Sequence, residues 1–386
     1  MRRILVIGRS DSVFVKRLLQ NIYNLDRSDL EIELFDSGHY PEEVSNRDIS
    51  YNAYGLQVPR CCRLLFRIPV LRIFLRIFFE YTTLEKILRQ KRYDAINVHE
   101  VPFYSWAYVK CAHKYDVKAI LTPIGSDALR VNGWARSLLQ KGFDKADYVT
   151  ITANSGFAEK VIRKFSIDRN KIRDLSYGSD AISEISRMKG HYSKKELAQM
   201  LNIPIADYYI CCGYNAHKAQ NHTDMFGAIA ANAGRLPKGC MVLFPLGYGG
   251  GEAVRKELEQ VNMHYGLDMV YIMDYLSPDK VAALRLITDL FIHIQDTDAH
   301  SFTMREFLLA DTQVINGRWL SYPELEQFGV PYYECENKDT LKDILASFFK
   351  GELPLIDCPE DLKKYLQKSS WDNVVLHWTN FYTSEN

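Results

Sequence analysis

Short apolar runs alternate with helix-length amphipathic segments along most of this chain, and the alternation occurs twice. The apolar runs of the first half lie at 4–8, 31–35, 95–99, 118–122 and 148–152. Those of the second half lie at 208–213, 240–245, 269–273, 289–294 and 313–315. Strands that alternate with helices are typical of a parallel sheet with helices on both faces. The sequence therefore predicts an α/β fold built from two such sheets.

The length of the chain, 386 residues, exceeds what one hydrophobic core usually organises. Between the two halves the apolar rhythm loosens and charged stretches replace it. We therefore expect two Rossmann-like domains that face each other across a cleft. The predicted parts are an N-terminal domain over 1–180, a linker over 181–206, a second domain over 207–358, and a C-terminal helix over 359–386 that packs back on the first domain.

Composition excludes several classes of protein. The 48 basic and 48 acidic residues leave no net charge, whereas a general nucleic-acid binder carries a basic excess. The eight cysteines have no CxxC spacing, so neither a zinc site nor a disulfide framework is expected. The first apolar run is too short for the core of a signal peptide, and no run reaches the ~20 residues of a membrane span. We expect a cytoplasmic protein in a reducing compartment, with no metal site.

Ligands of parallel sheets bind beyond the carboxyl ends of the strands, so the loops that follow the strands are the candidate sites. The loop at 213–222 follows the first strand of the second domain and opens a helix, whose backbone amides attract a diphosphate. An ordinary solvated turn is an equal alternative at this position. The candidate donor-binding residues of this loop are Gly213, Asn215, His217 and His222, and Lys218 is a catalytic candidate.

The loop at 245–252 has four glycines within five positions. An ordinary turn needs one or two glycines, whereas a backbone that approaches a ligand closely uses more. Contact with a ligand is therefore favoured here over a plain flexible turn. The candidate donor-binding residues of this loop are Gly247, Tyr248, Gly249 and Gly250.

Two carboxylates flank the helix that follows the run at 289–294. Asp298 lies eight residues before Glu306, and both suit sugar hydroxyls or a ribose. Carboxylates near a helix start also occur as plain dipole partners. Ser301 is a good N-cap for the same helix. Beside the two carboxylates, the candidate donor-binding residues here are His300, Ser301 and Phe302.

The N-terminal domain offers polar side chains at the ends of three apolar runs. Asp127, within 123–130, suits a catalytic base that takes the proton of an acceptor hydroxyl, and an N-cap aspartate is an equal alternative. Ser10 and Asp11 follow the first run, and His99 ends the third. These three are the candidate acceptor-binding residues, although a lone histidine at a strand end is more often structural.

Residues 60–79 combine bulky apolar side chains with five arginines and no acidic residue. The arginines recur at roughly helical spacing, and Pro69 interrupts the run. A basic, strongly apolar helix of this kind is typical of a membrane interface. A buried helix whose arginines reach the surface is the alternative. The absence of acidic residues favours peripheral contact with a membrane.

Five stretches of the chain resemble the GT-B glycosyltransferases, above all the large retaining family of capsule and lipopolysaccharide enzymes, glycosyltransferase family 4. These stretches lie at 4–12, 93–99, 122–127, 146–155 and 171–180. The resemblance implies a metal-independent transferase that takes a nucleotide-diphosphate sugar as its donor and uses no other cofactor.

The same resemblance implies roles for particular residues. The acidic pair of the family falls on Asp298 and Glu306, with aspartate in place of the first glutamate, and Glu306 corresponds to a ribose-binding group. Lys218 and His222 are the nearest counterparts of the basic pair that binds the diphosphate. Asp127 stands near the position expected for the catalytic histidine.

The loops at 213–222 and 245–248 are also similar to the bacterial 4-acetamido-4,6-dideoxygalactose transferases. This similarity implies a glycan or undecaprenyl-linked acceptor in surface polysaccharide synthesis at the inner face of the cell membrane. It leaves retention or inversion of the anomeric centre open. A nucleotide-sugar 2-epimerase of the same fold and a non-catalytic scaffold of glycosyltransferase ancestry are the alternatives. A dinucleotide-dependent oxidoreductase is disfavoured, because GxGxxG does not follow the first run.

Overall fold

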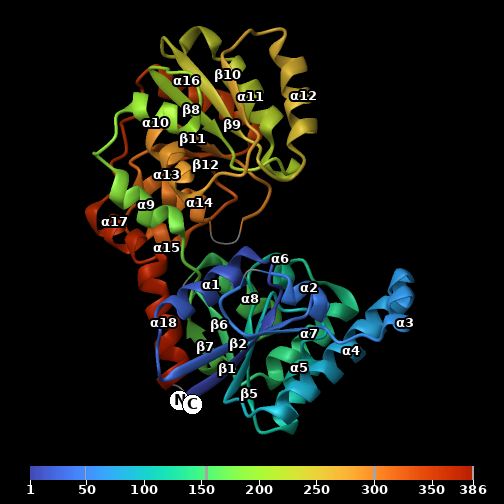
Figure 1. Cartoon of the computed structure of the whole chain (residues 1–386). Helices are drawn as coiled ribbons and strands as arrows, with labels where there is room; N and C mark the ends of the chain where they lie inside the picture. Colours follow the sequence, from blue (N-terminus) through green and yellow to red (C-terminus); the bar gives the residue numbers. More distant parts are fainter. Residues whose placement is uncertain (48, 153–154, 299–300, 385–386) are drawn as a thin grey trace. The chain divides into compact units, whose positions relative to one another are not determined.

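The computed structural model describes residues 1–47, 49–152, 155–298 and 301–384. The chain forms two compact units (Figure 1). Unit 1 comprises Met1–Gly178 together with Trp371–Asn386, and unit 2 comprises Ser179–Ser370. Each unit has one sheet of parallel strands with helices packed around it, so the predicted α/β class with two Rossmann-like sheets is confirmed.

Unit 1 is built on a seven-stranded sheet with the order β3-β2-β1-β4-β5-β6-β7. Its strands are β1 (Arg2–Gly8), β2 (Leu30–Asp36), β3 (Ala53–Gly55), β4 (Ala95–His99), β5 (Lys118–Thr122), β6 (Tyr148–Ile151) and β7 (Ile172–Asp174). Its helices are α1 (Val13–Asn24), α2 (Pro41–Ser45), α3 (Arg60–Arg63), α4 (Pro69–Gln90), α5 (Trp106–Lys114), α6 (Ser126–Leu129), α7 (Gly133–Lys145), α8 (Gly156–Phe165) and α18 (Trp371–Ser384). The register pairs Ile4 of β1 with Ile32 of β2 and Ala95 of β4. Helices cover both faces of such a sheet, which is why the central strand is continuously apolar.

Unit 2 is built on a six-stranded sheet with the order β10-β9-β8-β11-β12-β13. Its strands are β8 (Tyr208–Cys212), β9 (Cys240–Pro245), β10 (Met269–Ile272), β11 (Leu290–His293), β12 (Gln313–Gly317) and β13 (Tyr333–Cys335). Its helices are α9 (Asp180–Met188), α10 (Lys194–Leu201), α11 (His222–Ala230), α12 (Gly251–Asn262), α13 (Pro278–Ile287), α14 (Phe302–Leu309), α15 (Pro323–Glu326), α16 (Leu341–Phe349) and α17 (Glu360–Gln367). The register pairs Ile210 of β8 with Val242 of β9 and Leu290 of β11.

Both sheets reverse their strand order beside the first strand. In unit 1 the reversal lies between β1 and β4, and in unit 2 it lies between β8 and β11. At this point the chain connections that follow the two neighbouring strands run to opposite sides. The loops at the carboxyl ends of these strands therefore separate and form a crevice, in which ligands of such sheets bind. The topology therefore directs attention to the loops that follow β8 and β11 in unit 2 and β1 and β4 in unit 1.

The linker predicted over 181–206 is instead a packed part of unit 2. These residues form most of α9 and all of α10, and α9 packs on α13. Ile182, Ile185 and Leu197 are buried in the same core cluster as Leu243 of the sheet. The charged residues that suggested a linker lie on the outer faces of two short amphipathic helices. The prediction of a linker was wrong for this reason.

The C-terminal stretch predicted as one helix is divided between the units. Helix α17 packs against α14 and α9 of unit 2. Helix α18 packs on α1 and the sheet of unit 1, and the indole of Trp378 donates to the Ser176 carbonyl at 2.7 Å. Between these two helices, the Ser369 carbonyl accepts a hydrogen bond of 2.9 Å from the Ser179 amide.

Among the described residues, no helix combines the length and the apolar character that crossing a bilayer requires.

Candidate functional site

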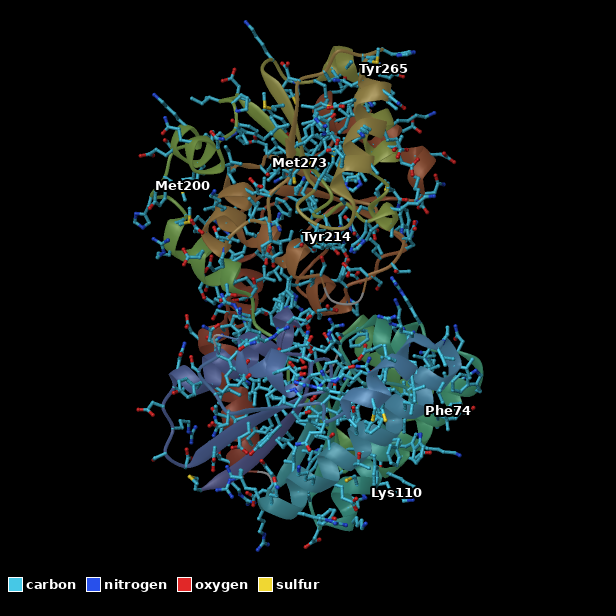
Figure 2. All side chains as sticks on the ribbon, turned by 45° about the vertical axis from the view of Figure 1, so that its right-hand side comes forward. Phe74, Lys110, Met200, Tyr214, Tyr265 and Met273 are labelled. Atoms are coloured by element: carbon cyan, nitrogen blue, oxygen red, sulfur yellow. The ribbon has the colours of Figure 1, made fainter. Side chains whose placement is uncertain are left out.

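The loops that follow β8 and β11 contact each other at the switch point of the unit 2 sheet. The side-chain amide of Gln220 donates to Gln295 Oε1 at 2.7 Å, and the Tyr214 hydroxyl donates to the same oxygen at 3.1 Å. Asn221 Nδ2 donates to the Ile294 carbonyl at 2.8 Å. Tyr214, labelled in Figure 2, therefore stands where the two loops meet.

The loop that follows β9 packs on the loop that follows β8. The Ala216 amide donates to the Tyr248 carbonyl at 2.7 Å, and Asn215 Nδ2 lies 3.4 Å from the Tyr248 hydroxyl. A Cβ atom at Gly249 would lie 2.8 Å from the backbone nitrogen of His217, and φ of Gly249 is +94°. Glycine at 249 is thus required both by the contact between the loops and by its own backbone conformation.

The other predicted glycines fall into two kinds. A Cβ atom at Gly247 would lie 2.4 Å from the Asp274 carbonyl oxygen, and one at Gly213, where φ is +65°, would also meet a neighbour within 3 Å. Gly250, with φ of +100°, has open space at its Cβ position and is the N-cap of α12. The amides of Gly250 and Gly251 have no hydrogen-bond partner among the described residues. These two amides begin a helix and are available to an anion.

Two basic side chains are exposed on the loop that follows β8, which packs on Gly249. His217 and Lys218 lie at the start of a 3₁₀ turn, and neither forms an ion pair with a described residue. The Tyr248 ring lies 5.8 Å from the His217 ring and 6.1 Å from the Tyr275 ring, measured between centroids. Tyr248 is 46% exposed and Tyr275 is 69% exposed. The surface of this loop cluster therefore offers positive charge, free amides and aromatic faces.

His222 is a buried neutral ring. It begins α11 with 4% exposure, and burial lowers the pKa of its imidazole to about 4. Its Nε2 atom has no hydrogen-bond partner among the described residues. A neutral imidazole can exchange a hydrogen bond with a ligand, but it supplies no charge. The predicted basic pair is therefore wrong in one respect, because the neutral His222 ring adds no positive charge to it.

Asp298 lies in a small polar group that follows β11. Its Oδ2 atom accepts the Tyr322 hydroxyl at 2.7 Å and lies 3.3 Å from His293 Nε2. Ser301 is the N-cap of α14, because its Oγ atom accepts the Met304 amide at 3.1 Å. This cap confirms the sequence prediction for Ser301.

Two further predicted residues belong to the same loop. Phe302 is the first residue of α14. His300 lies outside the described residues.

The Glu306 carboxylate is buried in unit 2 and accepts hydrogen bonds from two neighbouring side chains. Its Oε1 atom accepts the Ser179 hydroxyl at 2.8 Å, and its Oε2 atom accepts Arg285 Nε at 3.1 Å. The side chains of Arg285 and Glu306 are 6% and 7% exposed. A carboxylate committed to a buried cation is not presented to a ribose, so the predicted sugar contact gives way to a structural role.

Unit 1 has a polar cluster where β1 and β2 end. Asp36 accepts the Ser10 amide at 3.1 Å and His39 Nδ1 at 3.1 Å. Arg47 donates to His39 Nε2 at 2.8 Å, which makes Nδ1 the protonated nitrogen of the ring. Ser10 Oγ is buried and has no hydrogen-bond partner among the described residues. The predicted acceptor residue Ser10 thus keeps an unused hydroxyl at this edge of the sheet.

Asp11, the next predicted acceptor residue, is paired with Arg9. Two bonds of 2.9 and 2.8 Å join the guanidinium to the carboxylate. The hydrogen bond from Arg9 is the largest cause that lowers the pKa of Asp11. Asp11 is therefore ionised, and its acceptor-binding role stays a prediction.

Asp127 closes a turn. Its carboxylate accepts the amides of Val101, Ile124 and Gly125 at 2.9, 3.1 and 2.6 Å. Burial raises the pKa of this carboxyl group, and the three amides oppose that shift. A base must release its hydrogen bonds to take a proton, and here three of them hold two loops together. These contacts give Asp127 a structural role, but not the expected N-cap, because it is the second residue of α6. Its catalytic role stays a prediction.

His99 is enclosed by aromatic rings. It is 2% exposed, its Nδ1 atom bonds the Tyr177 hydroxyl, and its ring lies 5.7 Å from the Trp378 ring. Burial lowers the pKa of His99 to about 3. This burial favours the structural alternative for His99, although its Nε2 atom has no hydrogen-bond partner among the described residues. The acceptor contact of His99 stays a prediction.

Sequence analysis missed several members of the unit 2 cluster. Tyr275 follows β10, the strand next to β9, and the rule that selected the other loops would have found it. Gln295 and Tyr322 carry no charge or glycine signal, and they join the cluster only because β11 and β12 are neighbours in the sheet. Arg285 lies inside a helix, and its position relative to the apolar residues of that helix is one that an ordinary surface residue would also occupy.

Comparison with known proteins gives one family model that matches part of the chain, and several solved structures of similar fold. Residues 19–180 match the model of Glycosyltransferase Family 4. None of the curated proteins matches the sequence.

Three solved structures have similar folds. A sucrose-phosphate synthase from Thermosynechococcus elongatus has a TM-score of 0.69 and 14% identity over 99% of this chain and 98% of that chain. Anabaena HepE in complex with UDP has a TM-score of 0.67 and 13% identity over 100% of both chains. The UDP-GlcNAc 2-epimerase from Neisseria meningitidis bound to UDP-GlcNAc has a TM-score of 0.62 and 13% identity over 100% of both chains. These likenesses show the fold.

Proposed function

We propose that this chain, which has the GT-B fold of the glycosyltransferases, transfers a sugar from a nucleotide-diphosphate sugar to a glycan or lipid-linked acceptor. The observation that carries the proposal is the cluster of three loops in unit 2, which gathers exposed basic side chains, free helix-start amides and aromatic rings on one surface. A nucleotide diphosphate has the matching features, namely anionic phosphates and a flat base. Residues 19–180 match the glycosyltransferase model, which supports a transferase.

The diphosphate would bind at the start of α12. The amides of Gly250 and Gly251 supply hydrogen-bond donors, and Lys218 and His217 lie on the loop that contacts the preceding residues, Tyr248 and Gly249. Charged hydrogen bonds to phosphate oxygens are about twice as strong as neutral ones. Tyr248 and Tyr275 offer exposed ring faces on which a base or sugar can stack.

Transfer would proceed mainly by stabilising the departing diphosphate. The fixed amides and the Lys218 ammonium meet the charge that develops as the glycosidic bond to the phosphate breaks. This set of donors supplies the stabilisation without calling on a metal ion. The acceptor hydroxyl would be positioned in unit 1 by Ser10 and Asp11, and Asp11 is held ionised by Arg9. The oxygen of that hydroxyl would bond to the anomeric carbon as the bond to the diphosphate breaks, and its proton would pass to the departing diphosphate. Asp127 and His99 take no part in this proposal.

A nucleotide-sugar 2-epimerase is the second candidate, and the likeness to the Neisseria enzyme bound to UDP-GlcNAc favours it. An epimerase converts its nucleotide sugar without an acceptor. A transferase needs the acceptor for turnover beyond slow hydrolysis. The two candidates therefore share a donor site and differ in what the reaction consumes.

The first test is a thermal-shift panel of nucleotide diphosphates and their sugars in the presence of a chelator. A ligand at one hundred times its dissociation constant adds about 2.7 kcal/mol of stability. Lys218→Ala removes a charged hydrogen bond worth about 1.5–3 kcal/mol, so we expect affinity to fall about tenfold to a hundredfold. Lys238→Ala is the matched control, because Lys238 is an exposed lysine that precedes β9 and lies away from these loops.

The outcomes separate the candidates. A shift with one nucleotide that weakens in Lys218→Ala and persists in Lys238→Ala supports the donor site. Conversion of the matching sugar nucleotide without any acceptor would favour the epimerase. If no nucleotide shifts the transition of a well-folded sample, the transferase proposal fails and a non-catalytic scaffold is the better account.

A further inference from the structure

The basic apolar segment (residues 60–78) of unit 1 is folded without being buried. It comprises α3, a 3₁₀ turn over Leu64–Arg67 and the first half of α4, and none of its residues is buried. Figure 1 shows α3 and the start of α4 extending away from the rest of unit 1. Buried residues of α4 begin only at Phe79. One side of the segment is partly covered, because Ile73, Leu75 and Ile77 are half-buried and the Phe66 ring stacks on Phe79 with centroids 6.2 Å apart. Its other side carries apolar side chains that unit 1 leaves uncovered.

The segment holds an unusual share of the exposed apolar side chains. Of twenty-two large apolar side chains that are exposed among the described residues, seven lie in this segment. These seven are Leu64, Leu65, Ile68, Val70, Leu71, Phe74 and Phe78. Phe74, labelled in Figure 2, is 67% exposed. Contiguous exposed apolar surface of this kind marks a site of interaction.

The charge of the segment identifies its partner. It has five arginines and no acidic residue. Arg63 pairs with Glu42, and Arg76 pairs with Glu80 at 2.6 Å. The other three, Arg60, Arg67 and Arg72, are exposed and form no ion pair with a described residue. The unpaired positive charge is thus interspersed with the exposed apolar side chains.

We propose that the basic apolar segment docks on an anionic phospholipid membrane. Its apolar side chains would enter the boundary between headgroups and acyl chains, and its unpaired arginines would contact lipid phosphates. A second copy of this chain is a poorer occupant, because self-pairing would bring two sets of unpaired arginines together. Membrane docking goes beyond sugar transfer and is measured without it.

The root of the segment is rigid, so docking would orient unit 1. Glu80 is 1% exposed and accepts Arg76 Nε, the Tyr104 hydroxyl and the Tyr108 hydroxyl. Arg76 also donates to the Ser37 carbonyl at 3.2 Å. Ser37 directly follows β2, at the edge of the sheet that holds Ser10. A docked segment would therefore fix the proposed acceptor edge relative to the lipid surface.

The test is vesicle sedimentation with the full chain, in the absence of nucleotide. We expect binding to vesicles of phosphatidylcholine mixed with phosphatidylglycerol and weak binding to pure phosphatidylcholine. Arg60→Gln, Arg67→Gln and Arg72→Gln together should lower the partition coefficient on the order of a hundredfold. The matched control replaces three exposed arginines outside the segment, Arg92, Arg130 and Arg163, with Gln. It changes the net charge equally and should retain most of the binding.

Two more measurements locate the contact. Phe74→Ser with Phe78→Ser should weaken binding at least tenfold, whereas Trp134→Ser, which removes an aromatic ring 64% exposed elsewhere in unit 1, should not. An environment-sensitive fluorophore on the exposed thiol of Cys61, in a Cys62→Ser background, should shift to the blue on anionic vesicles.

Three results would overturn the proposal. The first is equal binding to neutral and anionic vesicles, and the second is equal loss in the segment variant and its matched control. The third is a dimer that dissociates in Phe74→Ser with Phe78→Ser while wild type ignores vesicles. Failure here leaves nucleotide binding in unit 2 untouched, so it is distinguishable from failure of the transferase proposal.

Discussion

Replacing Glu306 with leucine tests whether its carboxylate holds unit 2 together. Glu306 on α14 and Arg285 on α13 form an ion pair whose side chains are 6% and 7% exposed. The Arg285 guanidinium also lies 4.4 Å from the Phe307 ring centroid, and its Nη1 atom has no hydrogen-bond partner among the described residues. Loss of the carboxylate would leave a buried cation whose remaining side-chain contact among the described residues is that ring.

The expected cost follows from this burial. Removing one partner of a buried ion pair typically destabilises by about 3–5 kcal/mol, because the remaining charge stays desolvated. Both partners are nearly inaccessible, so screening by solvent gives little relief. Glu306→Gln keeps hydrogen-bond acceptors without the charge and should cost less than Glu306→Leu. Arg285→Met combined with Glu306→Leu removes both charges and should recover most of the loss.

Hydrogen exchange with peptide-level readout is the suitable assay, because it reports on unit 2 separately from unit 1. We expect the slowest amides of β8 and β11 to exchange faster in Glu306→Leu by the factor that corresponds to about 3–5 kcal/mol. The strands of unit 1 should keep their protection. A loss below about 1 kcal/mol, or a double variant less stable than Glu306→Leu, would refute the buried pair. Nucleotide shifts of any Glu306 variant must accordingly be measured against its own unliganded transition.

Further predictions concern pH, the glycine loop and the C-terminal helix. Burial lowers the pKa of His99 from 6.5 to about 3, so the stability that the neutral ring contributes is present above about pH 6.5 and is lost as the pH falls toward 3. Between pH 7 and pH 5 the free energy of unfolding of the wild type should therefore fall by about 2 kcal/mol. His99→Asn should not show this fall, and urea unfolding at the two pH values measures it. Gly249→Ala should abolish the nucleotide thermal shift and destabilise unit 2 more than Gly250→Ala does. Both glycines have positive φ, but only a Cβ atom at 249 would lie 2.8 Å from a backbone nitrogen, that of His217. Equal destabilisation by the two variants would contradict the loop contact. Trp378→Ala should cost about 3–5 kcal/mol and accelerate hydrogen exchange in unit 1 alone, and faster exchange in unit 2 would contradict the assignment of α18.

Sequence periodicity predicted the central strands of both sheets and the edge strand β10, but not the other edge strands. The observed β4, β5 and β9 have the predicted bounds, because buried parallel strands are continuous apolar runs. The edge strands β3, β7 and β13 have three residues each, too few to display a period. Strands of this length form because a neighbour supplies the hydrogen bonds, and that neighbour is distant in the sequence.

The site was predicted at the level of loops and less well at the level of side chains. The rule that ligands bind beyond strand ends selected the β8 and β9 loops, and the structure brings these loops into contact. The roles of individual side chains depend on partners far along the chain. Glu306 binds Ser179 across 127 residues, and His99 binds Tyr177 across 78. No local pattern reveals such partners, so conspicuous titratable residues were assigned to a ligand when the fold uses them internally.

The use of these titratable residues inside the fold bears on the proposed chemistry. Asp127, His99 and Glu306 are the groups that a sequence would nominate as base or sugar ligand, and each is committed to the interior of its unit. The groups exposed on the unit 2 loops include Lys218, His217 and two tyrosines, and also three carboxylates, those of Glu252, Asp274 and Asp296. Among these groups, Lys218 and the helix-start amides are the ones that can stabilise a departing anion. If the chain transfers sugars, the rate should therefore depend on the quality of the leaving diphosphate and on Lys218.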